Sequence, residues 1–396
     1  MKSIARCLLA YMAATVVVVT PSMLTADPLD AAAGKALFDR QWVPAPASTN
    51  SADGLGPLFT ARSCAACHRG GDGSYVVRGE DGLADIQGAV VRFGREDGTT
   101  DPTYGLELQT HAVPGLDPEG SAHFLPGLSY TLKGPPLAEG MKVGVRLAPS
   151  LFGRAAFDDV PDDEILKRAD HDDRDGDGIS GRANRTAHGI GRYGWKAAQV
   201  TLRDQIAHAF AFDIGLSSPR YPLPYGDCTD LQKECLAAAN GESPGFDGRE
   251  VSGAMLDLVA AYLRTVPARP KAADAEAAAL FEATGCARCH VPTLRTRDGR
   301  QIPAFTDLLL HDMGAELNDG VGEPGVSPSE WRTAPLIAGH TQPEGAKVRR
   351  YLHDGSAQMV AEAVAKHGGE AARSRDLFAS LKPEDRKRLV EYVNGL

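Results

Sequence analysis

Two short motifs constrain this chain more than any other feature: "CAACH" at residues 64–68 and "CARCH" at residues 286–290. Two thiols one helical turn apart can add to the two vinyl groups of one haem, and the adjacent histidine then becomes an axial ligand of the iron. A single Cys-x-x-Cys pair would also fit a zinc site or a redox dithiol. Two copies, each followed by histidine, predict two covalently bound haem c groups. The attachment residues are Cys64, Cys67 and His68 for the first, and Cys286, Cys289 and His290 for the second.

The sequence around the two motifs also repeats. Ala-rich segments that favour helix precede them, at residues 30–42 and 273–285. Apolar residues at helical spacing follow them, at residues 255–266 and 386–396, and Pro383 suits the first turn of the last helix. An opening helix, an attachment motif and a closing helix form the minimal cytochrome c domain, so the chain is expected to contain two.

The expected fold class is therefore mainly α, with two cytochrome c-like haem domains. Residues 27–268 form the N-terminal domain and residues 269–396 the C-terminal one, joined near the Pro- and Ala-rich segment "VPARPKAAD". The first domain is longer than a cytochrome c needs. Residues 75–150 are rich in Gly and Pro and contain short β-like runs such as "GAVVRF" and "KVGVRLA". We expect loops and short strands to enlarge the first domain there.

The first 26 residues have the features of a secretory signal. Lys2 and Arg6 precede the apolar run "CLLAYMAATVVVV", and small residues lie before Asp27. The run is short for a membrane span. We predict a signal peptide at residues 1–26 and export to the periplasm; an uncleaved N-terminal anchor is the alternative.

Two further cysteines and the net charge bear on partners. Outside the cytoplasm, Cys228 and Cys235 are expected to form a local disulfide, with a pair of reactive thiols as the alternative. The formal net charge of −10 argues against a nucleic-acid partner.

An acidic segment, "DHDDRDGDGISGR" at residues 170–182, resembles the start of a calcium loop. Asp173, Asp175 and Asp177 alternate before a turn glycine, so their oxygens can converge on a hard cation. Asn184 stands where an EF-hand loop would have Glu, which leaves that motif incomplete. A structural calcium ion is one reading, and a solvated acidic turn is the other.

Beyond these motifs, most of the mature chain resembles one family. The matching segments are "PTYGLELQTHAVPG" (102–115), "DRDGDGISGRAN" (173–184), "GRYGWKA" (191–197), "FTDLLLHDMG" (305–314), "EWRTAPL" (330–336) and "YLHDGSA" (351–357). Their order resembles the "di-haem oxidoreductase, putative peroxidase" family, sometimes labelled thiol oxidoreductases, which is related to bacterial di-haem cytochrome c peroxidases and MauG.

The resemblance implies roles for two residues near the first haem. The peroxidases have a Trp between the haems, followed seven residues later by Leu-x-x-Gln, and here Trp195 precedes "LRDQ" (202–205) at that spacing. Trp195 is then an electron stepping stone, or else an ordinary core residue. Asp213 lies near the position of a catalytic Glu. It would exchange protons with peroxide as a general acid–base, or else be an ordinary polar helix residue.

For the second haem, the resemblance identifies a distal ligand. The peroxidases place a Met sixteen residues after the Tyr of a Tyr-Phe-His-Asp-Gly motif, and counting sixteen from Tyr351 reaches His367. This departure predicts a bis-histidine haem of lower potential, because Met favours the ferrous state. His353 is then a hydrogen bonder in the haem pocket.

The same resemblance places four more residues around the haems. Trp331 and Arg332 are expected to pack on a haem and contact its propionates, since the guanidinium fork suits a carboxylate. His311 and Met313 are expected to line a haem without binding iron.

The distal ligand of the first haem stays open among His111, His123, Tyr104 and Met141. The function implied is peroxide reduction at the first haem, with electrons passing through the second. The donor would be a small cytochrome c or a cupredoxin, and the family allows a homodimer. The alternatives are a pure electron-transfer cytochrome and a MauG-like enzyme that oxidises a protein partner.

Overall fold

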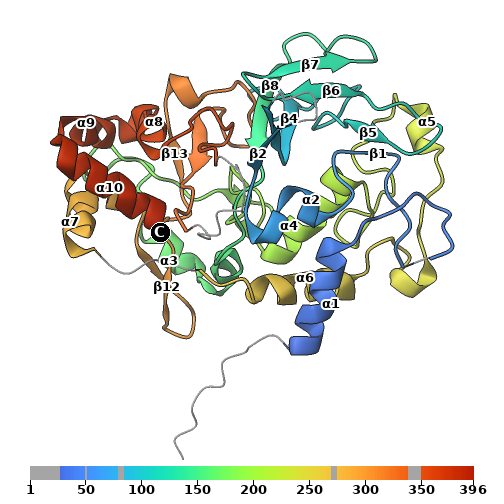
Figure 1. Cartoon of the computed structure of the whole chain (residues 1–396), viewed down its shortest axis with the longest axis horizontal. Coiled ribbons are helices and arrows are strands. Elements are labelled where there is room, and N and C mark those ends of the chain that lie inside the picture. The colour runs from blue at the N-terminus through green and yellow to red at the C-terminus, as the bar shows by residue number, and fades with distance from the viewer. Residues whose placement is uncertain (1–26, 50, 79–83, 269–273, 338–348) are drawn as a thin grey trace, which may run out of the picture.

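A computed structural model of the chain describes residues 27–49, 51–78, 84–268, 274–337 and 349–396 (Figure 1). The expected signal peptide and residues 269–273 of the expected linker lie outside the described residues. Within the described part, no helix is long and apolar enough to cross a membrane.

The helices are α1 (Pro28–Asp39), α2 (Cys64–Cys67), α3 (Asp162–Leu166), α4 (Leu202–Ala209), α5 (Lys233–Leu236), α6 (Gly253–Arg264), α7 (Ala275–Ala283), α8 (Val360–Ala365), α9 (Ala372–Ser380) and α10 (Pro383–Gly395). The strands are β1 (Leu58–Phe59), β2 (Tyr75–Arg78), β3 (Ala84–Gln87), β4 (Ala89–Gly94), β5 (His111–Ala112), β6 (Gly120–His123), β7 (Ser129–Leu132), β8 (Lys142–Leu147), β9 (Arg185–Thr186), β10 (Gly189–Ile190), β11 (Thr293–Arg295), β12 (Gln301–Pro303), β13 (Leu310–Asp312) and β14 (Glu330–Arg332).

The prediction of a mainly α fold is only partly right. Helices account for 31% of the chain and strands for 18%. The strands form antiparallel two-stranded sheets within the described residues, and the longest register pairs β4 with β8. Three of these pairs, β2 with β3, β4 with β8 and β6 with β7, lie in the Gly- and Pro-rich insertion, where the short strands were expected. These strands carry two small buried clusters of their own, one around Phe93 and one around Val145, beside the larger clusters that the helices form.

The predicted opening and closing helices are present in both halves. α1 packs against α6, and α7 packs against α10. Gly34 lies at the first of these crossings, where a Cβ atom would come within 1.8 Å of the carbonyl oxygen of Leu258, so only glycine allows the two helices to approach this closely. As predicted, Pro383 is in the first turn of α10. In Figure 1, α7 to α10 gather on one side of the molecule, and α1, α2, α4 and α6 on the other.

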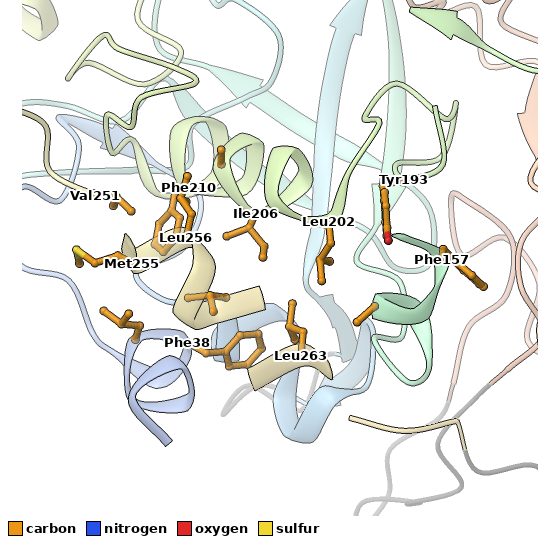
Figure 2. Packing of buried hydrophobic residues seen from close by; sticks show 14 of the residues in the cluster. Phe38, Phe157, Tyr193, Leu202, Ile206, Phe210, Val251, Met255, Leu256 and Leu263 are labelled. Carbon is orange, nitrogen blue, oxygen red and sulfur yellow. The ribbon is translucent and has the colours of Figure 1, made fainter. Parts of the chain in front are cut away.

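Each attachment motif packs against its own hydrophobic core. The larger core lies between α1, α4 and α6 and includes Phe38, Ile206 and Leu256 (Figure 2). Cys64 packs against it. The smaller core joins Phe281, Phe305, Phe378, Leu389 and Leu396, and Cys286 packs against that one. The two motifs are therefore held by separate groups of helices.

Candidate haem sites

The second attachment motif lines a cavity of about 320 Å³ that is mostly apolar. Cys286, Cys289 and His290 lie on its wall together with His367, which follows α8. The first half of the chain also contributes to the wall, through residues 72–74, residues 147–150 and Trp195. The cavity therefore lies between the two halves.

His290 and His367 have the same hydrogen-bond pattern. His290 donates from Nδ1 to the carbonyl oxygen of Phe305 at 3.1 Å, and His367 donates from Nδ1 to that of Ala363 at 2.7 Å. These bonds leave both Nε2 atoms free. Burial lowers the pKa of His290 to about 4, helped by the nearby His367, and burial also lowers the pKa of His367. Both rings are therefore neutral at neutral pH, which is the form that coordinates a metal.

Two buried arginines line the same cavity. Arg332 donates from Nε to the carbonyl oxygen of Gly194 at 2.8 Å, and Arg154 donates from Nε to that of Ser150 at 2.9 Å. Burial lowers the pKa of both, and the proximity of Arg332 further lowers that of Arg154, to about 9. The Nη1 of Arg154 is buried without a hydrogen-bond partner among the described residues.

Two crowded guanidinium groups with an unused donor beside an apolar cavity call for an anionic ligand. A haem, with an apolar ring and two propionates, meets this need. The residues present at the second site thus fit a haem. Arg332 was expected here. Arg154 was missed, because nothing in its local sequence marks it.

Three aromatic rings contact one another in a row on another wall of the cavity. The ring of His353 lies parallel to that of Trp331, with centroids 3.7 Å apart, and meets the ring of Trp195 edge-on at 6.4 Å. Trp195 donates from Nε1 to the carbonyl oxygen of Leu147 at 2.8 Å. His353 thus contributes to this wall mainly by ring contacts, and its Nε2 lies 3.8 Å from a carboxylate oxygen of Asp319.

His311 and Met313 also line the cavity, as expected. His311 has both ring nitrogens engaged, Nε2 with Asp307 at 2.9 Å and Nδ1 with Glu370 at 2.7 Å. No nitrogen of this ring is left to bind iron in this arrangement.

The first attachment motif lies at α2, which is capped by Ser63 through the N–H of Ala66 at 3.2 Å. His68 follows directly. Burial lowers its pKa to about 4, against the opposing effect of the carbonyl groups of Asp72 and Pro149 beside its ring. His68 is therefore neutral, which is the form that can coordinate a metal. Residues 72 and 149 also line the second cavity, so the two sites share a wall.

Beside the first motif, the structure brings Asp213 together with a group of buried charges. Asp213 belongs to a π-helical segment, η3 (Phe210–Ile214). Burial, together with the Asp213 carboxylate, raises the pKa of both the Cys64 and Cys67 thiols to about 12. Burial raises the pKa of Asp213 against the opposing charge of Arg92, and Arg92 Nε also lies 3.1 Å from Glu107 Oε2. Asp213 thus lies close to the first haem attachment site.

Sequence reasoning missed Glu107, Arg92 and the residue that holds Glu107 in place. Asp227 Oδ2 accepts hydrogen bonds from the backbone N–H groups of Leu106 at 2.7 Å and Glu107 at 2.9 Å. Glu107 lies inside a segment that matches the family, "PTYGLELQTHAVPG", but a single Glu between Leu106 and Leu108 belongs to no motif that would mark it as a buried charge. The contacts that bury it come from residues far away in the sequence.

The family comparison agrees with the site. The family model described as "Di-haem oxidoreductase, putative peroxidase" matches residues 129–396. The chain belongs to this family. It is therefore an enzyme, a peroxidase-like oxidoreductase with haem cofactors.

Other comparisons add little. No curated protein matches the chain of this di-haem oxidoreductase. Among solved structures, hydrazine synthase of Kuenenia stuttgartiensis, pressurised with 20 bar xenon, matches with 21% identity and a TM-score of 0.25. The match covers 43% of this chain and 63% of the other, less than two thirds of its length. Nothing about fold or activity follows from a TM-score this low.

The residues considered as distal ligands of the first haem in this di-haem oxidoreductase are spread over the insertion. His111 is exposed and stacks on Phe59 with centroids 5.4 Å apart, and His123 is exposed and lies 3.1 Å from Asp85. The hydroxyl of Tyr104 donates to the carbonyl oxygen of Pro135 at 2.6 Å. Met141, at the start of β8, is half-buried. None of the contacts of these residues involves His68.

The acidic loop of the oxidoreductase brings its three aspartates together. Carboxylate oxygens of Asp173, Asp175 and Asp177 all lie within 4.8 Å of one another. Asp177 also forms an ion pair with Arg288, inside the second attachment motif. Asn184 is turned away, since its amide donates to the carbonyl oxygen of Lys196 at 3.0 Å. The three carboxylates fit a cation, and Asn184 takes no part.

Cys228 and Cys235 are joined by a disulfide in the structure. Cys228 directly follows Asp227, the residue that holds the backbone of Glu107. The cross-link therefore fixes the segment that supports the buried charges of the first site.

Proposed function

We propose that this di-haem oxidoreductase reduces peroxide at the first haem and receives the electrons through the second. The observation that supports this most is the difference between the two sites. Two neutral histidines face the second cavity, whereas a buried carboxylate, Asp213, lies beside the first attachment motif. Two ring ligands suit electron storage, and a carboxylate beside an open position suits proton transfer to a substrate.

At the second site, Cys286 and Cys289 would form the thioether links, and His290 and His367 would be the axial ligands. Their bonds to the carbonyl groups of Phe305 and Ala363 support this role, because such bonds fix the tautomer and the ring orientation of a ligating histidine. Arg332 would hold a propionate, and Trp331 would pack against the pocket wall.

At the first site, Cys64 and Cys67 would form the thioether links, and His68 would be the proximal ligand. The haem, when bound, supplies the redox chemistry that cleaves the O–O bond. Asp213 would take the proton of one peroxide oxygen and give it to the other, which leaves as water. The balanced reaction consumes one hydrogen peroxide, two protons and two electrons and yields two waters.

Trp195 would connect the two sites. Its indole N–H binds the carbonyl group of Leu147, and the chain continues two residues further to Pro149, whose carbonyl group lies beside the ring of His68. Trp195 also lines the second cavity. An aromatic ring on the second cavity, bonded to the backbone segment that continues to His68, is a suitable relay for single electrons.

The wider setting is part of the same proposal. The chain would be exported to the periplasm and fold as two cytochrome c-like units, residues 27–268 and 269–396, with a calcium ion at Asp173, Asp175 and Asp177. The packing of α1 on α6 and of α7 on α10 supports the two units. A small cytochrome c or a cupredoxin would supply the electrons.

Electron paramagnetic resonance of the purified ferric protein tests the proposal. One low-spin and one high-spin haem, together with peroxide-dependent oxidation of a reduced donor protein, are expected. Two low-spin haems that persist after partial reduction, without peroxide turnover, would instead identify a pure electron-transfer cytochrome.

A further inference from the structure

Arg154 belongs to the first half of the chain but holds a segment of the second half. It is the first residue of a short helical turn, η2 (Arg154–Asp159). Its Nη2 donates to the carbonyl oxygen of Pro335 at 2.9 Å and to that of Ile337 at 3.5 Å. Ile337 is buried in the smaller hydrophobic core, against which Cys286 packs. Arg154 therefore lies where the first half meets the core behind the second attachment motif.

The hydrogen bonds of the Arg154 guanidinium group show that it needs a further acceptor. Every nitrogen of this rigid, planar group is a donor and none accepts. Nε donates to the carbonyl oxygen of Ser150 at 2.9 Å, and Nη2 serves Pro335 and Ile337. The remaining nitrogen, Nη1, is buried without a hydrogen-bond partner among the described residues. Because a buried donor without an acceptor is costly, Arg154, which lines the second cavity, calls for an acceptor there.

The charges on this wall of the cavity are also unbalanced. Arg349 lines the same cavity, and its Nη2 lies 3.2 Å from Asp72 Oδ1. Arg154 and Arg332 form no such ion pair within the described residues, since their hydrogen bonds go to backbone carbonyl groups. Both stay charged at neutral pH: burial and the charge of Arg332 lower the pKa of Arg154 only to about 9, and burial lowers that of Arg332 to about 10. An anionic ligand in the mostly apolar cavity would balance these two cations.

We propose that Arg154 and Arg332 together bind the propionates of the second haem and thereby raise its reduction potential. The inference rests on the function proposed above, in which the second haem receives the electrons, and it adds a residue of the first half to that site. Arg154 is a positioning residue for the haem. The bonds of Nε and Nη2 hold the guanidinium plane, and Nη1 is left for a carboxylate oxygen.

The direction of the effect on the potential follows from the charges. Oxidation of the haem iron adds a positive charge, so a nearby cation disfavours the ferric state. Propionates without a partner act in the opposite direction. Two histidine ligands also hold the potential below that of a histidine–methionine pair. The two arginines offset this effect, so that the second haem can still accept electrons from its donor protein.

Two substitutions separate the charge of Arg154 from its bonds to the backbone. Arg154→Gln keeps an amide donor but removes the charge, whereas Arg154→Lys keeps the charge but removes the planar fork. Redox titration of the full-length holoprotein measures the potential of the second haem. Resonance Raman spectroscopy follows the bending of its propionates, whose frequency depends on their hydrogen bonds. Both variants should shift a propionate band. Arg154→Gln should also lower the potential, and Arg154→Lys should lower it much less.

Arg192→Gln is the matched control. Arg192 is also an arginine of the first half with a buried side chain, 4% exposed, and it donates to the carbonyl oxygens of Ile190 at 2.7 Å and Val160 at 3.0 Å. It differs because it pairs with Asp162 at 2.6 Å and is not part of the cavity wall that the described residues form. Arg192→Gln should therefore destabilise the protein without changing the propionate bands or the potential. If Arg154→Gln does not fold, Arg154→Lys still tests the contact through the propionate band.

The outcomes separate this inference from the peroxide function. If no propionate band changes in either Arg154 variant, or if the potential does not fall in Arg154→Gln, the inference is overturned even if wild-type protein reduces peroxide. An equal fall of the potential in Arg154→Lys or in Arg192→Gln overturns it as well. If the band and the potential change as expected but wild-type protein does not consume peroxide, the role of Arg154 stands and the peroxide function fails.

Discussion

Trp331 and His353 stack face to face on the wall of the second cavity, with ring centroids 3.7 Å apart and planes inclined by 13°. Burial, followed by the nearby positive charges of Arg146 and Lys196, lowers the pKa of His353 well below its usual value, so the ring in this stack is neutral. The guanidinium carbon of Arg146 lies 4.6 Å and Lys196 Nζ 3.7 Å from the ring centroid of Trp331, and burial lowers the pKa of Lys196 to about 7, so Arg146 is the lasting cation there at neutral pH. A cation over the face of an aromatic ring is attracted to its π electrons. The same positive charge makes it harder to remove an electron from the ring.

Trp195 and Trp331 should therefore differ in electron transfer. Trp195→Phe is expected to slow transfer between the haems by on the order of tenfold, because it removes the indole N–H bond to the backbone segment that leads to His68. Trp331→Phe, the matched control, should leave this rate unchanged, because its cations already make Trp331 a poor relay. Stopped-flow spectroscopy after reduction of the second haem measures both. Equal slowing by the two variants would rule out this distinction.

The ligand set of the second haem can be tested by three variants. His367→Ala should convert the second haem from low spin to high spin, since it removes a neutral ring whose Nε2 faces the cavity. His353→Ala should leave the haem low spin. His367→Met should also keep it low spin and raise its reduction potential, because a thioether favours the ferrous state. Electron paramagnetic resonance and redox titration report these changes. A high-spin haem in His353→Ala would contradict the assignment.

His311 should contribute to stability in a pH-dependent way. Burial alone would lower its pKa, but the Asp307 carboxylate raises it well above 6.5. Because the folded-state pKa is the higher one, this stabilisation is complete below pH 6.5 and is lost as the pH rises through the folded-state pKa.

The variant His311→Leu leaves Asp307 and Glu370 buried without their shared partner, and we expect a loss of about 3–5 kcal/mol at pH 6. Urea unfolding at several pH values measures it. The triple variant with Asp307→Asn and Glu370→Gln should recover part of the loss. A cost for His311→Leu that does not fall with rising pH would refute the charged state of the ring.

Calcium should stabilise the protein through the acidic loop. At a calcium concentration 100 times the dissociation constant, the gain in folding free energy is about 2.7 kcal/mol. We expect calcium to raise the melting temperature of wild type and of Asp172→Asn, which alters an acidic neighbour outside the trio, but not that of Asp175→Asn. Calorimetry with and without a chelator provides the measurement. A melting temperature that does not respond to calcium would mark the loop as a solvated acidic turn.

The parts of the fold that were predictable from sequence are local ones. The opening and closing helices are predictable from the spacing of apolar residues within about a dozen positions. The place of Pro383 in the first turn of α10 is predictable because that position needs no N–H donor. The runs that became β4 and β8 were recognised as strands. Their pairing, Val91 opposite Val145, was not, because the partners are separated by a long stretch of loop whose course no local pattern specifies.

The candidate sites divide in the same way. Each Cys-x-x-Cys-His motif contains two cysteines and a histidine within five consecutive residues, so it can be recognised from the sequence alone. Arg154 and Glu107 are held by residues that are distant in sequence, such as Pro335 for Arg154 and Asp227 for Glu107. Whether these two side chains are buried depends on the residues that the fold packs around them, and those residues come from distant parts of the chain.

The cavity around Cys286 determines whether the two halves of the chain can fold as separate fragments. Its walls include residues 72–74, residues 147–150 and Trp195 in addition to segments of the C-terminal half. A fragment that begins near residue 269 would contain the attachment motif and both candidate axial histidines, yet it would expose one flank of an apolar pocket to water. Gene fragments encoding the halves separately should therefore give poorly soluble products, and co-expression should restore a soluble complex.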